Sequence, residues 1–260
     1  MKQIIIAVLM VSSTTLFSQA YKVIKVSGSI LYKKNETPLR KGNSFNAGEE
    51  FLFKTNNSRA AVIQPGKGRF VLKPDNDNLA YAKANLAPAI GNVSSRAGAL
   101  VNRMDLENYF KGNCVIIDKI KLKISNKEFP MDDNHIFYIS YKYKGEIIPK
   151  KLEYKEDTLI IDKKELLTID GRPIPNPDIT EMTINYLDKT QGKKHFVIGK
   201  FNPVFPDEKE LKEEIQMLLD GLAGKSRKDK IKEITSYIND FYGKPDKENL
   251  VVWLKKEFNL

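Results

Sequence analysis

Residues 119–124 read Lys-Ile-Lys-Leu-Lys-Ile, and this alternation of charged and apolar side chains decides the fold class. Successive side chains of a β-strand point to opposite faces of its sheet, so the stretch predicts a strand with one solvated and one buried face. Short runs of strand character recur on both sides of it, separated by glycine, proline and asparagine. The sequence therefore predicts a mainly β protein up to residue 205, where the pattern changes to that of helices.

Two small β-sandwich-like units are expected, at residues 21–79 and 112–205. The strand candidates of the first unit are residues 23–26, 29–32, 50–53, 60–63 and 69–72. Those of the second unit are residues 114–117, 120–124, 136–139, 159–161, 182–186 and 195–198. Residues 80–111 form a connector that is too apolar for a free linker and carries a short possible helix at residues 105–110.

About three amphipathic helices are expected in residues 206–260, which completes a mainly β fold with an α-helical C-terminus. Each helix begins after a residue type that caps helix N-termini, namely Asp207, Ser226 and Asp246. A segment of this length supports only a marginal core of its own. The apolar stripes of its helices therefore need to be covered by other residues. We expect a partner protein to supply it, and the alternative is that the helices pack on the second β-unit. The candidate partner-binding residues are Leu211, Ile215, Leu218, Phe241, Trp253 and Phe258.

The N-terminal segment, residues 1–20, has the features of a cleavable signal peptide. Lys2 precedes an apolar core at residues 4–11, and small residues at Ser18 and Ala20 fit cleavage after Ala20. The apolar run is too short for a membrane span, although an uncleaved anchor helix is the alternative. We therefore expect an exported protein of the periplasm or the extracellular space, peripheral to a membrane at most.

The first β-unit resembles a known family through four segments. Residues 26–30 read Val-Ser-Gly-Ser-Ile, residues 37–45 Thr-Pro-Leu-Arg-Lys-Gly-Asn-Ser-Phe, residues 47–51 Ala-Gly-Glu-Glu-Phe, and residues 57–62 Asn-Ser-Arg-Ala-Ala-Val. This order of glycine turns and apolar strands resembles the FecR-like domain, a periplasmic β-module. The resemblance covers residues 21–79 only and brings no catalytic residue. It implies an envelope protein-interaction module with a possible place in envelope signalling.

The charge balance is basic but gives no specific binding motif. The chain has 43 Lys and Arg against 33 Asp and Glu, a formal net charge of +10. Most of the excess is lysine interleaved with apolar residues, which is typical of a solvated sheet face. The alternative interpretation is attraction to an anionic envelope polymer. Nucleic acid is not an expected partner, because the signal peptide directs the chain out of the cytoplasm.

The sequence shows no constellation for catalysis, a metal or a cofactor. His135 and His195 lack companions at metal-ligand spacing, and Asp132 with Asp133 precedes His135 as in a common turn. Cys114 begins an apolar run, which favours a buried thiol over a nucleophile, and a single cysteine forms no disulfide within the chain. We therefore expect a non-enzymatic envelope scaffold or protein-interaction protein without cofactors. The alternative is an envelope hydrolase acting on a cell-wall polymer.

Overall fold

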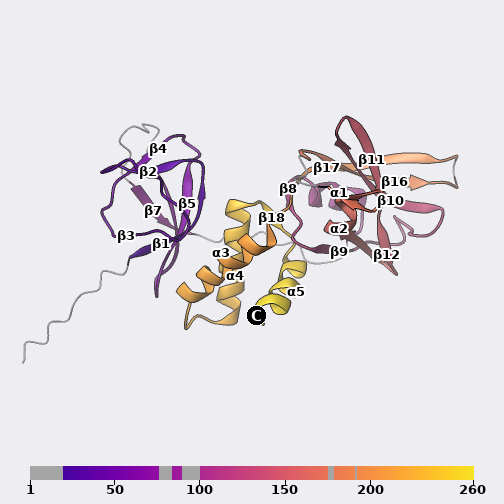
Figure 1. Ribbon diagram of the computed structural model, residues 1–260. Helices are drawn as coiled ribbons and strands as arrows, with labels where there is room; N and C mark the ends of the chain where they lie inside the picture. Colours follow the sequence, from indigo (N-terminus) through magenta and orange to yellow (C-terminus); the bar gives the residue numbers. More distant parts are fainter. Residues whose placement is uncertain (1–19, 76–83, 90–99, 175–178, 191) are drawn as a thin grey trace, which may run out of the picture.

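The computed structural model describes residues 20–75, 84–89, 100–174, 179–190 and 192–260 (Figure 1). This part of the chain is mainly β with a helical C-terminal region, which confirms the predicted fold class. Residues 1–19 of the predicted signal peptide and parts of the predicted connector lie outside the described ranges.

The strands of the N-terminal unit are β1 (Tyr21–Ser27), β2 (Ile30–Tyr32), β3 (Ser44–Phe45), β4 (Phe51–Phe53), β5 (Arg59–Gln64), β6 (Gly68–Pro74) and β7 (Ala84–Pro88). The later strands are β8 (Gly112–Val115), β9 (Lys119–Lys123), β10 (His135–Tyr143), β11 (Glu146–Lys151), β12 (Glu153–Lys155), β13 (Thr158–Asp162), β14 (Thr168–Ile169), β15 (Arg172–Pro173), β16 (Met182–Asp188), β17 (Lys194–Val204) and β18 (Lys244–Pro245). The helices are α1 (Arg103–Tyr109), α2 (Lys163–Leu166), α3 (Glu208–Gly221), α4 (Arg227–Phe241) and α5 (Lys247–Phe258).

The N-terminal unit is an antiparallel sheet in the order β3-β1-β5-β6-β7, accompanied by the pair β2-β4. Its own core gathers aromatic and aliphatic side chains such as Val23, Phe45 and Phe51 from both groups of strands. The turn after β1 needs glycine, because Gly28 has a φ of 78° and a Cβ there would lie 2.6 Å from Ser58 Oγ. Strands β5 and β6 follow each other in the chain and pair as an antiparallel hairpin.

The second unit combines a six-stranded sheet, β11-β10-β16-β17-β8-β18, with a three-stranded sheet, β12-β13-β9. Inward side chains of the two sheets share one core, which includes Ile120 and Leu122 from the alternating stretch at residues 119–124. The lysines between them, Lys119, Lys121 and Lys123, are exposed, as the alternation predicts. Helix α1 packs on β17 and contributes Leu106 to this core.

The C-terminal helices lie between the two β-units (Figure 1). Asp207, Ser226 and Asp246 cap α3, α4 and α5, which confirms the three predicted helix starts. The helices share a third core with Ile24 and Ile63 of the N-terminal unit and with Val115 of β8 and Ile117, which follows this strand. Strand β18, between α4 and α5, joins the six-stranded sheet directly beside β8.

None of the helices in the described ranges has both the length and the apolar character that crossing a membrane requires.

Candidate functional site

The predicted partner-binding residues lie in the third core, where the helices meet both β-units. Leu211, Ile215 and Leu218 of α3 are fully buried, and Trp253 of α5 is 5% exposed. Phe241 and Phe258 are partly buried and pack against the same core. The candidate partner-binding residues therefore come together in space.

Their cover, however, comes from the chain itself, which corrects the expectation of an open docking stripe. The three short helices do not bury these side chains among themselves alone, as their size leads us to expect. The missing surface is supplied by Ile24, Ala61 and Ile63 on one side and by Val115 and Ile117 on the other. The alternative of packing on the second β-unit is only half of the arrangement, since the N-terminal unit packs on the helices as well.

A buried carboxylate, Glu214 of α3, connects the helices to the N-terminal unit. Its side chain has no exposed surface and accepts hydrogen bonds from Tyr237 Oη at 2.7 Å and Tyr242 Oη at 2.6 Å. Lys25 Nζ of β1 donates to its other oxygen at 3.0 Å. Burial, followed by the charge of Glu214, raises the pKa of Tyr237, so this hydroxyl stays protonated and donates. The cluster neutralises a charge that would otherwise be costly to bury.

A second buried charge, Arg69 of β6, faces α4. Its guanidinium group is fully buried and lies 2.8 Å from Asp240 Oδ2, while Nη2 donates to Ser236 Oγ at 2.7 Å. Its Nε lies 3.7 Å from Glu233 Oε2. Burial raises the pKa of Glu233, despite the opposing charge of Arg69. Both buried clusters thus join the N-terminal unit to the helices rather than forming an open site.

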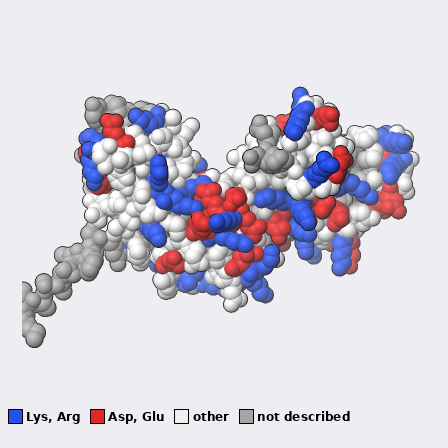
Figure 2. All heavy atoms as spheres, in the orientation of Figure 1, with Lys and Arg blue, Asp and Glu red and all other residues white. Residues whose placement is uncertain are grey.

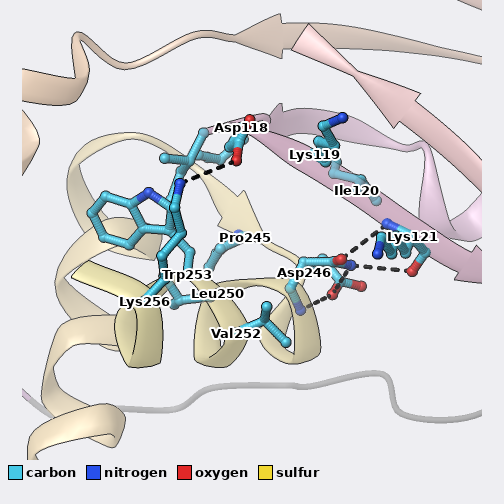
Figure 3. Close-up of a pocket in the computed structure, with 13 residues that line it drawn as sticks. Asp118, Lys119, Ile120, Lys121, Pro245, Asp246, Leu250, Val252, Trp253 and Lys256 are labelled. Atoms are coloured by element: carbon cyan, nitrogen blue, oxygen red, sulfur yellow. Dashed lines mark hydrogen bonds and ion pairs between the residues drawn. The ribbon is translucent and has the colours of Figure 1, made fainter. Parts of the chain in front are cut away.

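On the opposite side of the helices, a small groove lies between α5 and the turn that leads into β9 (Figure 3). Trp253 and Leu250 contribute apolar surface to it, and Lys256 Nζ approaches Asp118 Oδ2 at 3.9 Å. Asn249 accepts a hydrogen bond from the Lys121 amide at 2.9 Å and donates to its carbonyl at 3.2 Å, so it covers the edge of β9 as a neighbouring strand would. With a volume of about 200 Å³, the groove accommodates one side-chain-sized group.

Acidic side chains gather over the helical region, with basic side chains next to them (Figure 2). Two pairs explain part of this pattern, because Lys41 lies 2.7 Å from Glu213 and Lys212 lies 2.8 Å from Glu208. These pairs are exposed, so each stabilises the fold by at most about 1 kcal/mol.

The residues singled out for chemistry are spread over the structure. The Asp132 carboxylate accepts the backbone amides of Asn134 and His135 and contacts the His135 ring at 2.9 Å, which are the hydrogen bonds of a turn. His195 pairs with Tyr138 Oη at 3.0 Å on the sheet surface. Cys114 is buried, and burial raises the pKa of its thiol to about 12. Within the described ranges, no group of three or more potential metal ligands comes together.

The buried charged clusters are the feature that the sequence analysis missed. One signal for them is present, because Glu214 is three residues from Leu211 and four from Leu218 and therefore falls on the apolar face of α3. Its partners, Lys25 and the two tyrosines, are distant in sequence, and no spacing rule links them.

No family model matches the chain, and no curated protein matches it. The resemblance of residues 21–79 to the FecR-like domain therefore stays a prediction.

Proposed function

We propose that the chain is a non-enzymatic, exported scaffold of a bacterial cell envelope that presents its two β-units to another envelope protein in one fixed arrangement. The predicted signal peptide supports export to the envelope. The FecR-like resemblance of residues 21–79 supports a role in protein interaction, within envelope signalling.

The observation that carries the proposal is the shared core of the C-terminal helices and both β-units. Ile63 and Val115 belong to different units and are buried in one cluster with Leu218. A flexible connection between the units would expose such side chains to water. The free-energy cost would be about 25 cal/mol for each Å² of apolar surface exposed. Burial therefore favours one relative placement of the units, which is the property that a scaffold requires.

The placement can be measured with spin labels at Lys54→Cys in the N-terminal unit and Lys155→Cys in the second unit, in a Cys114→Ser background. The wild type should give one narrow distance distribution. Glu214→Ala, which breaks the buried cluster, should broaden it. Glu213→Ala is the matched control, because it removes an exposed carboxylate from the same helix and should leave the distribution unchanged.

The functional half of the test is cross-linking of the tagged protein in its native envelope. The scaffold proposal expects one defined partner with the wild type and with Glu213→Ala, and loss of that partner with Glu214→Ala. Equal recovery with both variants would contradict a role for the fixed arrangement. Release of soluble fragments from purified cell-wall polymer would instead support the hydrolase.

A further inference from the structure

A second groove lies between α4 and α5. It has a volume of about 770 Å³, which is in the range of ligand-binding clefts. The residues that line it are Arg227, Lys228, Asp229, Ile231, Lys232, Thr235, Lys247 and Val251.

The lining is strongly basic, with four cationic side chains against one carboxylate. Arg227, Lys228 and Lys232 are exposed, and none of their side chains forms an ion pair with another residue in the described ranges. Elsewhere on the surface, lysines such as Lys41 pair with carboxylates at close range. These three groove side chains therefore carry positive charge that no ion pair within the described part of the chain balances.

Helix stability does not account for these positions. Arg227 and Lys228 occupy the first turn of α4, and Lys247 is the first residue of α5. The N-terminus of a helix carries partial positive charge, so cations there are unfavourable by about 0.3–1 kcal/mol each. An anion in the groove would reverse this effect, because it would interact favourably both with the side chains and with the helix terminus.

The cations are distributed along the groove rather than gathered at one point. Arg227 and Lys232 are about 7.5 Å apart along the helix axis, so several anionic groups of one ligand can each meet a cation. Lys228, Ile231, Lys232 and Thr235 follow the spacing of one helix face, and the half-buried Ile231 lies between the cations. This arrangement fits anionic groups separated by a less polar linkage.

We propose that the groove between α4 and α5 binds closely spaced phosphate groups, presented either by a soluble phosphate polymer or by anionic lipid headgroups. The multiple donors of Arg227 suit phosphate oxygens, and the lysines add point charges along the groove. The site does not depend on the scaffold role, since its residues lie outside the shared core apart from the packing edge at Ile231.

The test measures binding of the full chain to two probes at about 0.15 M salt, where non-specific attraction is screened. One probe is sodium polyphosphate, and the other is vesicles of phosphatidylglycerol with phosphatidylcholine. The variant is Lys228→Gln with Lys232→Gln. The matched control is Lys151→Gln with Lys155→Gln, which removes two exposed lysines of the second β-unit and leaves the same net charge.

The groove variant should bind at least about tenfold more weakly than the wild type, whereas the control should change by less than about twofold. Dependence on the groove with polyphosphate identifies a soluble polymer, and dependence with vesicles alone identifies headgroups. Equal losses in both double variants, or no binding of either probe, would overturn the proposal. Neither variant should lower the thermal melting temperature, because all four lysines are exposed, and the loss of Lys228 from the first turn of α4 can only raise it slightly.

Discussion

Glu214→Ala should be among the most destabilising single substitutions in the helical region. It removes a fully buried carboxylate that accepts hydrogen bonds from Lys25, Tyr237 and Tyr242. Removal of one partner from a buried ion pair costs about 3–5 kcal/mol, because the remaining groups lose their compensation. The Lys25 side chain is 19% exposed and lies 3.8 Å from Glu210, so part of its charge finds water and a second carboxylate. We therefore expect the lower end of that range, about 3 kcal/mol.

Urea unfolding of the wild type and the variant, followed by fluorescence and circular dichroism, measures this loss. A decrease of about 3 kcal/mol is large against a total stability of about 5–15 kcal/mol. Glu213→Ala on the same helix should lose at most about 1 kcal/mol, because its pair with Lys41 is exposed. A double-mutant cycle with Lys25→Met isolates the contact between Lys25 and Glu214, which joins the N-terminal unit to the helices. A coupling of more than about 1 kcal/mol is expected.

The reasoning would be refuted if Glu214→Ala and Glu213→Ala lost the same small amount of stability. It would be refuted equally if the cycle gave no coupling between Lys25 and Glu214. In either case the buried cluster would not connect the helices to the N-terminal unit energetically.

Three further predictions concern separate parts of the structure. Gly221→Ala should destabilise the protein in urea unfolding, although alanine usually favours a helix, because its Cβ would lie 2.1 Å from Ile63 Cγ1; unchanged or increased stability would contradict the close approach. Cys114, with its pKa raised to about 12 by burial, should resist a thiol reagent such as dithionitrobenzoate at pH 8 and react only on unfolding; rapid reaction of the native protein would show an exposed thiolate. Glu233→Gln should raise stability at pH 7, because burial raises the pKa of this carboxyl and its ionised form opposes folding. The gain should decrease as the pH falls and disappear well below pH 4.5, where Glu233 is protonated in both the folded and the unfolded state; a gain independent of pH would contradict this cause.

Local signals in the sequence predicted the elements well. The caps Asp207, Ser226 and Asp246 start helices in the structure, because capping depends on residues three positions apart. The strand at residues 119–124 follows from alternation alone for the same reason. The short helix α2 and the hairpin strands β11 and β12 were not predicted, because they lack either signal and are determined by the surrounding packing.

The packing of the helices on both β-units could not be predicted from the helices themselves. Their apolar stripes show that other residues must cover them, but not which residues these are. Ile24 and Leu218 are far apart in the chain, and amphipathicity is the same whether the cover is a β-unit or another protein. Glu214 illustrates the difficulty further. Its position on an apolar face indicates a buried partner, but Lys25 is one of many lysines that could fill this role.

The identity of the cover nevertheless has a signature in the strands. A strand with one solvated face alternates, as residues 119–124 do, whereas a strand buried on both faces reads as a continuous apolar run. Residues 60–63 read Ala-Ala-Val-Ile and residues 114–117 read Cys-Val-Ile-Ile, and neither run alternates with polar residues. In the structure, alternate side chains of both runs enter different cores, with Ala61, Ile63, Val115 and Ile117 all facing the helices. Since each β-unit contains such a run, and a sandwich core covers only one face of it, the second face requires a further layer. The apolar stripes of α3 and α5 form that layer. The apolar surface that the helices cannot bury among themselves and the second apolar face of the two strands therefore cover each other.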